Sequence, residues 1–185
     1  RFLQNLLLDN MLLVDVYNQA KKLHIENDQK RIVFLVEAKS KDNQMLLETM
    51  KGMYASGMKD FVTAVDESSV ILVKALEETD GYREVYESAK SIADTVSAEA
   101  MVNIRVSYGT IIHELKDVSK SYKEAGMALD VGRIFYPGHN ILAYNELGIG
   151  RLIHQLPLSL CDMFLKEVFG ERDVSEFEEE TLSTD

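Results

Sequence analysis

Residues 61–76 read FVTAVDESSVILVKAL, and this stretch decides the expected fold. Two short apolar runs, FVTAV and VILVKAL, are separated by the four polar residues DESS at positions 66–69. Apolar runs on either side of a turn-sized polar gap are typical of two antiparallel strands joined as a hairpin. The sequence therefore predicts a β-hairpin with its turn at these four residues.

Helices are expected on both sides of this hairpin. Before it, residues 43–58 place apolar side chains on adjoining faces of a helix. After it, Asp80-Gly81 begins a second helix that extends to about residue 98 and carries a wide apolar stripe. Two helices therefore bracket the hairpin.

Strands are expected outside the two helices. Residues 31–39, RIVFLVEAK, are almost continuously apolar, which predicts a strand buried on both faces. Residues 103–109 alternate apolar and polar side chains, which predicts a half-buried strand. A long helix over 114–135 follows, Tyr136-Pro137-Gly138 ends it, and residues 140–144 form a last strand.

The expected order is therefore β-α-β-β-α-β-α-β. This order predicts an α+β sandwich of the split-βαβ, ferredoxin-like kind with an added strand, hence a five-stranded mixed sheet with helices packed on it. Right-handed crossovers place the strand at 31–39 near the centre of the sheet. The expected segments are a helical lead-in at 1–28, the domain at 29–147, a C-terminal helical extension at 148–170 and an acidic tail at 171–185.

The lead-in combines two helical segments. Residues 11–24 form one apolar stripe, and the preceding RFLQNLLL is also expected to be helical, with a break at Asp9-Asn10. The leucines of the first segment exceed what one narrow stripe needs, so they form either a partner surface or a face packed on the same domain. The stripe of the second segment consists of Leu13, Val16, Tyr17, Ala20 and Leu23.

Composition excludes several classes of function. The formal net charge of −11 argues against a basic face for duplex DNA, so nucleic-acid contact is expected outside this segment, with a local basic patch as the alternative. No run approaches the ~20 apolar residues of a membrane span. The lone Cys161 fits a reducing cytoplasm. The four histidines lie without metal-ligand spacing, so neither a metal nor another cofactor is expected.

The helix at 114–135 raises a question, because it carries the small residues Ala125, Ala128 and Gly132 on its apolar side. Small residues let either a ligand or another backbone come close. Close packing of this helix on the sheet is the expected answer, since an overpacked core position costs about 1–3 kcal/mol.

Residues 106–144 resemble the end of a GGDEF domain, the fold of the diguanylate cyclases. In that family a strand reads V-S-x-G, and the next helix ends in A-x-x-A-L-x-x-A-K-x-x-G-R-N. The resemblance implies a nucleotidyl-cyclase-type sandwich. The matching positions are Val106, Ser107, Gly109, Ala125, Ala128, Leu129, Gly132 and Arg133.

The cyclase signature itself is absent. Where a cyclase has Gly-Gly-Asp/Glu-Glu-Phe, this chain has DESSV at 66–70. A cyclase needs the two glycines because a Cβ would collide with the nucleotide, and it needs carboxylates at a magnesium ion. Glu37 stands where one metal-binding aspartate is expected, but Lys39 is a poor neighbour for a cation. We therefore expect no cyclase activity.

A closer resemblance is to the degenerate GGDEF-like middle domain of the bacterial purine-catabolism and carbohydrate-diacid regulators. There FL-x-x-LLL opens the lead-in, as in RFLQNLLLDN, and the long helix reads S-Y-x-E-A-x-x-A-L-x-x-G-R, as residues 121–133 do. After the last strand come E-L-G and R-L-L, matched by Glu146-Leu147-Gly148 and Arg151-Leu152-Ile153. The resemblance covers roughly residues 1–170.

This resemblance implies a non-catalytic regulatory and dimerisation domain of a cytoplasmic transcription regulator. The expected partners are a second copy of the chain and a downstream helix-turn-helix module that contacts DNA. The chain has no start methionine and is expected to be a piece of a longer protein. The alternative is a domain that binds a small-molecule or nucleotide effector without turnover. The pocket would then be lined by Glu37, Lys39, Asp66 and Glu67.

Overall fold

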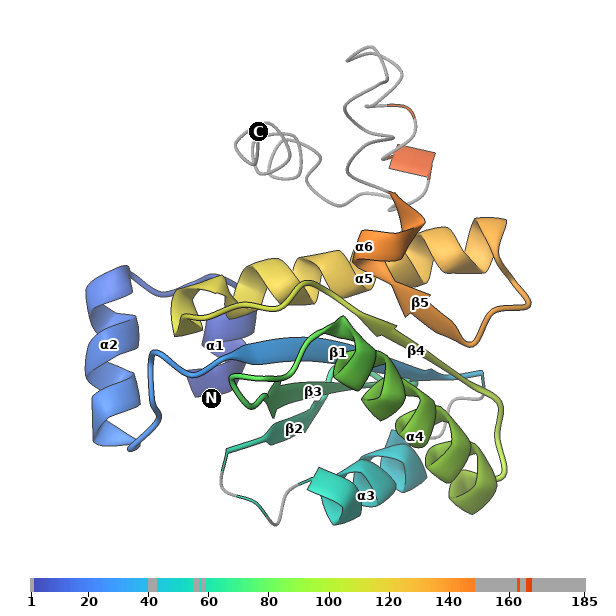
Figure 1. The fold of residues 1–185 in the computed structure, drawn as a ribbon, viewed down its shortest axis with the longest axis horizontal. Helices are drawn as coiled ribbons and strands as arrows, with labels where there is room; N and C mark the ends of the chain where they lie inside the picture. The colour runs from blue at the N-terminus through green and yellow to red at the C-terminus, as the bar shows by residue number, and fades with distance from the viewer. Residues whose placement is uncertain are drawn as a thin grey trace.

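The computed structural model describes residues 2–39, 43–54, 57 and 59–148, together with residues 163, 166 and 167. Within these residues five strands form a sheet in the order β2-β3-β1-β4-β5 (Figure 1). Neighbouring strands are antiparallel except β4 and β5, which are parallel. The predicted α+β sandwich with a five-stranded mixed sheet is confirmed. The strands are β1 (Arg31–Ala38), β2 (Phe61–Ala64), β3 (Ser69–Ala75), β4 (Ile104–Tyr108) and β5 (Ile141–Ala143).

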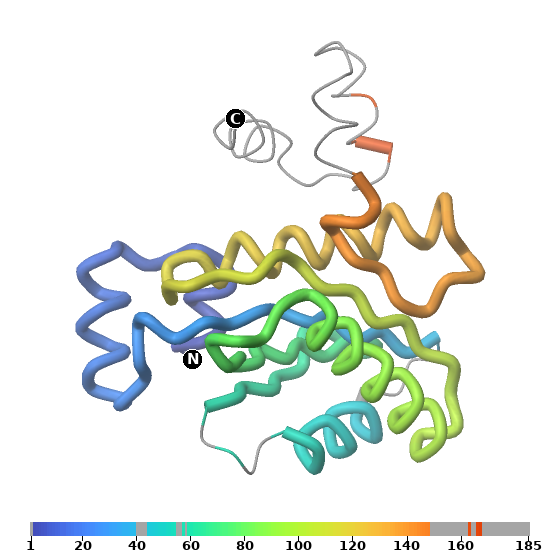
Figure 2. The backbone as a smooth tube through the Cα atoms, viewed as in Figure 1, coloured from blue at the N-terminus to red at the C-terminus, as the bar shows by residue number. Residues whose placement is uncertain are grey.

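The helices follow the expected order along the chain, as the backbone trace in Figure 2 shows. One short helix, α6, was not expected, since residue 144 was assigned to the last strand. The expected extension and tail after residue 148 lie outside the described residues, apart from three isolated positions. The helices are α1 (Phe2–Leu7), α2 (Leu13–Lys22), α3 (Asn43–Tyr54), α4 (Tyr82–Ala100), α5 (Val118–Phe135) and α6 (Tyr144–Leu147), with a 3-10 turn, η1 (Leu115–Asp117), before α5.

Helices cover both faces of the sheet (Figure 1). The strand β1 alternates between the two cores, because Val33 and Leu35 pack with α1, α2 and α5, whereas Phe34 and Val36 pack with α3 and α4. This explains why β1 is apolar at nearly every position. Its predicted place at the centre of the sheet is confirmed.

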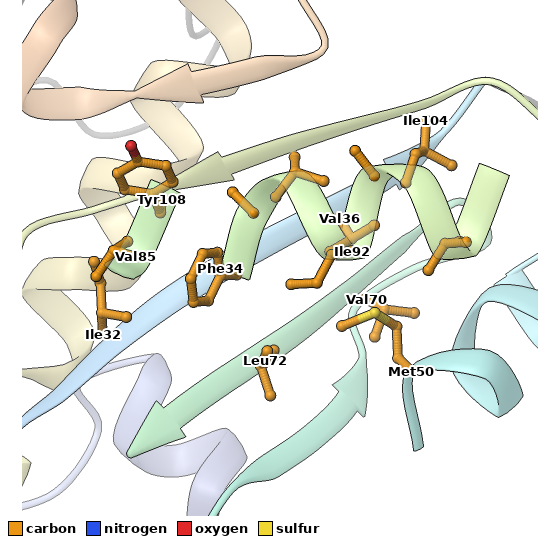
Figure 3. Close-up of a cluster of buried hydrophobic side chains, with 14 of the residues drawn as sticks. Ile32, Phe34, Val36, Met50, Val70, Leu72, Val85, Ile92, Ile104 and Tyr108 are labelled. Carbon is orange, nitrogen blue, oxygen red and sulfur yellow. The ribbon is translucent and has the colours of Figure 1, made fainter. Parts of the chain in front are cut away.

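Large side chains fill the core under α3 and α4. Figure 3 shows this cluster, in which the rings of Phe34 and Tyr108 meet edge to face with centroids 5.7 Å apart. Met50 of α3 and Ile92 of α4 close the cluster from the helical side. Burial accounts for a pKa of Tyr108 well above its ordinary value, with smaller contributions from Glu146 and two tyrosines.

The small residues of α5 serve close packing on the sheet, as predicted. A Cβ on Gly132 would lie 2.6 Å from Cδ2 of Leu142 in β5. A Cβ on Gly109, just after β4, would lie 2.7 Å from Oγ of Ser121 and closer still to its carbonyl oxygen. Ala125 is completely buried at this contact. The helix and the strands approach each other too closely for larger side chains.

One expectation about exposure was wrong, and one predicted apolar stripe is buried only in part. The strand β4 is buried on both faces, because α5 covers Ser107, whose hydroxyl donates a hydrogen bond of 2.8 Å to the carbonyl oxygen of Ala125. In α2 only Val16 and Ala20 of the expected stripe are buried. The other members of that stripe, Leu13, Tyr17 and Leu23, are each more than a third exposed.

None of the helices in the described part of the chain is both long and apolar enough to cross a membrane. The expected division of the chain at residues 28 and 147 stays a prediction.

Candidate functional site

The candidate site lies at the end of β1. It contains Glu37, the carboxylate expected from the sequence to stand where a cyclase has a metal-binding aspartate. Backbone pairing places Glu37 beside Ser69 of β3 and Arg105 of β4. Its side chain is 13% exposed. A partly exposed end of a central strand is a place where charged side chains from several elements can meet.

Both carboxylate oxygens of Glu37 face arginines. Arg133, at the end of α5, donates from Nε to Oε2 over 3.1 Å and also from Nη2 to Oε1. Arg105 of β4 approaches Oε2 with Nη1 at 3.8 Å. A carboxylate bound by one guanidinium through two hydrogen bonds and faced by a second is charge-neutralised from within the chain.

Arg133 has a second acidic partner. Its Nη1 donates over 2.8 Å to Oδ1 of Asp130, three residues earlier on α5. Burial alone would lower the pKa of Arg133, but its hydrogen bond to Glu37 and the charges of Glu37, Asp130 and Asp66 outweigh burial and raise it. This arginine therefore connects α5 to the end of β1, and the charge of Asp66 in the hairpin turn also acts on it.

Close packing of α5 positions Arg133. Gly132, the preceding residue, lies against Leu142 of β5 with no room for a Cβ. The helix end is thereby held close to the sheet, and the next side chain reaches the end of β1. Gly132 thus allows the helix to pack closely, and Arg133, the next residue, forms the ion pair with Glu37.

The turn between β2 and β3 closes the same end of the sheet without any glycine. Oδ1 of Asp66 accepts hydrogen bonds from the backbone N–H and the hydroxyl of Ser68, at 2.8 and 3.3 Å. The backbone N–H of Ala38 donates to the carbonyl oxygen of Ser68 over 2.8 Å, which joins the turn to β1. No residue of this turn has a positive φ, so side chains with a Cβ fit it without strain.

The structure places the four residues of the predicted pocket at this end of the sheet, Glu37 and Lys39 at the end of β1 and Asp66 and Glu67 in the turn. Glu37 and Asp66 both lie near Arg133. Lys39 is exposed just beyond β1, where its backbone N–H donates to Asn103, and Glu67 is exposed in the turn. Whether these four residues bind an effector stays a prediction.

A polar hollow of about 540 Å³ lies at the opposite end of β2 and β3, and none of the four residues lines it. Within it, burial raises the pKa of Asp60, although the backbone N–H of Ala75, which donates to Oδ1 over 2.8 Å, opposes this shift. Its lining consists of Gln29, Gly57, Lys59, Asp60, Lys74, Ala75, Leu76, Glu77 and Glu78.

Three residues of the site were not predicted as site residues: Arg105, Asp130 and Arg133. Arg133 was recognised only as part of a Gly-Arg pattern. The ion pair could have been inferred only with the pairing of β1 and β4 and the position of the end of α5, and neither follows from local patterns in the sequence.

Comparison with known proteins agrees with this architecture. Curated proteins gave no match. Residues 10–131 match the model of the GGDEF-like domain, a stretch that includes β1 to β4, the hairpin turn and most of α5. Because this match spans more than half of the chain, the protein belongs to the family of GGDEF-like domains.

Proposed function

We propose that this GGDEF-like domain is a non-catalytic regulatory domain of a cytoplasmic bacterial transcription regulator. It links an upstream sensor region to a DNA-binding module and assists dimerisation. The observation that carries the non-catalytic part is the engagement of Glu37 by Arg133 and Arg105.

This engagement disfavours nucleotide turnover for an electrostatic reason. A magnesium ion at Glu37 would have to displace a guanidinium that is hydrogen-bonded to it, and would lie beside a second one. Like charges at short range disfavour each other, and a displaced arginine would lose its counter-ion in a partly buried place. The turn at 66–69 adds a steric reason, since each of its residues carries a Cβ where a cyclase needs bare backbone.

The test is incubation of the chain with GTP and Mg²⁺, followed by chromatography for cyclic dinucleotide and by a thermal-shift measurement. We expect neither product nor a shift of the midpoint. Product that is formed by the wild type and lost in Glu37→Gln would overturn the proposal.

A second candidate is effector binding at the same end of the sheet. The Arg133 side chain is 40% exposed beside Glu37 and Asp130, so a polar ligand could reach it from solvent. A thermal shift with GTP in the absence of product would favour this second function over the first.

Exposed apolar side chains on the lead-in support the dimerisation part. Leu12, Leu13 and Val14 are 74%, 48% and 62% exposed at the start of α2. Light scattering at micromolar concentration is expected to give twice the chain mass. We expect Val14→Glu to shift the protein toward monomer, whereas Met101→Glu, at an 88% exposed methionine beyond α4, should leave the mass unchanged. A monomeric wild type would remove dimerisation from the proposal.

A further inference from the structure

A buried arginine at the start of β1 lies far along the strand from the site described above. Arg31 is only 2% exposed. Its backbone forms a two-way bridge with Ile112, with N···O distances of 2.9 and 2.8 Å. By strand alternation its side chain shares the face of Val33 and Leu35, the face covered by α1, α2 and α5. Figure 1 shows α2 beside the start of β1.

The guanidinium of Arg31 is incompletely satisfied. Its Nη2 donates to the carbonyl oxygen of Glu26 over 2.7 Å. The Nε and Nη1 atoms are buried and have no hydrogen-bond acceptor among the described residues. Burial lowers the pKa of Arg31, and the charge of Glu26 opposes this only in part.

A buried guanidinium with two unsatisfied nitrogens destabilises the folded protein unless another group accepts their hydrogen bonds. Arginine stays protonated in proteins, so a positive charge is held in a largely dry place. Buried charges are normally paired, and most buried polar atoms have a hydrogen-bond partner. The nearby segment holds a second such atom, because Oδ1 of Asn27 is also buried and without a donor among the described residues. The residues before β1 thus present both donors and an acceptor.

We propose that Arg31 anchors a small oxyanion, a carboxylate or a phosphate, on the α2 side of β1. The guanidinium supplies the positive charge and a free N–H donor; because the N–H groups of Nε and Nη1 point in different directions, one oxyanion accepts from only one of these two nitrogens. The acceptor on Asn27 favours a ligand that also carries an O–H donor.

The position of α2 couples such a site to the lead-in. The helix α2 buries only Val16 and Ala20 of its ten residues, so a small shift of α2 that admits the anion loses little buried apolar area. Occupancy would then change how the lead-in helix sits on the sheet. The inference rests on the proposed function only in treating the anion as an effector of the regulator; the binding itself is independent of it.

The net charge of the chain helps to distinguish binding at one site from general screening by salt. At −11 the protein repels anions as a whole. Saturable anion binding therefore reports a local site, whereas general screening by salt does not saturate in the same way.

The experiment is thermal unfolding of the 185-residue chain with increasing inorganic phosphate, or with malate as a hydroxylated dicarboxylate, at constant ionic strength kept with sodium chloride. Wild type is compared with Arg31→Met and with the matched control Arg83→Met, because the side chain of Arg83 is 84% exposed. We expect a saturable rise of the midpoint in wild type and in Arg83→Met but not in Arg31→Met. At ten times Kd, the ratio of folded to unfolded chain rises about elevenfold. The two ligands distinguish a phosphate site from a carboxylate site.

An equal rise in Arg31→Met would overturn the proposal, as would no rise above the sodium chloride control up to about 100 mM, where a site with millimolar Kd is filled. If Arg31→Met fails to fold, the Nε–H signal of Arg31 in the wild type is followed by NMR. This signal is assigned as the one that disappears from the spectrum of Arg31→Lys. A saturable shift of this signal with either anion supports the site, and an unchanged signal overturns it. Neither readout depends on GTP, so failure here leaves the test of the proposed function untouched.

Discussion

Arg133 at the end of α5 donates two hydrogen bonds to the carboxylate of Glu37 at the end of β1, across 96 positions of the chain. The pair connects the last turn of the long helix to the central strand of the sheet. It also occupies the carboxylate that we expected at a metal-binding position. One contact thus stabilises the fold and supports the proposed absence of catalysis.

Glu37→Gln is expected to lower the free energy of unfolding by about 2 kcal/mol, because it leaves Arg133 and Arg105 facing a neutral group. Arg133→Met should cost less, about 1 kcal/mol, since its side chain is 40% exposed and water screens the pair. Urea denaturation at neutral pH measures both. The double variant should cost less than the sum of the two single changes, and additive costs would show that the two residues do not interact.

The two tight glycines are expected to differ in their tolerance of a Cβ. Gly109→Ala meets the backbone and hydroxyl of Ser121, which cannot move without the helix, so we expect a loss of about 3 kcal/mol. Gly132→Ala meets only the end of the Leu142 side chain, and a better helix propensity offsets part of the clash, so about 1 kcal/mol is expected.

Gly52→Ala is the matched control for these glycines. It lies in α3 with no atom within 4 Å of an added Cβ, so it should stabilise the protein by about 0.5–1 kcal/mol. Urea midpoints rank the three variants. Equal effects of Gly109→Ala and Gly52→Ala would contradict close packing between α5 and β4.

The sequence was sufficient for most elements of the fold, α6 excepted, because each of these has a clear local pattern. The continuous apolar run of β1 indicated a strand covered on both sides, and the polar gap at 66–69 indicated the hairpin. The exposure of β4 was mispredicted because Ser107 reads as a polar, outward position. Its hydroxyl is satisfied by a carbonyl of α5, a contact that no local pattern reveals.

The candidate site could be predicted only in part for a similar reason. Glu37 and Asp66 were singled out through the resemblance to the cyclases, which implies a site between the end of the first strand and the hairpin turn. Their arginine partners depend on sheet register and on the length of α5. Arg31 was missed because a charged first residue of a strand normally reaches solvent, whereas here it is buried.

Ala125→Leu tests the packing of α5 directly. Ala125 has no exposed surface, and its carbonyl oxygen accepts a hydrogen bond from the hydroxyl of Ser107. A larger side chain at this position must therefore push the helix away from the sheet. We expect the melting temperature to fall by several degrees, which corresponds to about 1–3 kcal/mol of overpacking. Scanning calorimetry measures the change. An unchanged midpoint would show that this face of α5 tolerates added volume.

The start of α4 provides a prediction for pH. The carboxylate of Glu84 accepts a hydrogen bond of 2.8 Å from the backbone N–H of Gly81, and this bond lowers the pKa of Glu84 below its ordinary 4.5. A carboxylate with a lowered folded-state pKa stabilises the protein above its unfolded-state pKa, and this contribution disappears as pH falls through the folded-state value. Glu84→Ala should therefore lower the urea midpoint at about pH 7 and leave it nearly unchanged at about pH 3. Glu87→Ala, an exposed position on the same helix, controls for the loss of one charge. A difference between Glu84→Ala and wild type that is constant over this range would contradict the role of the ionised carboxylate.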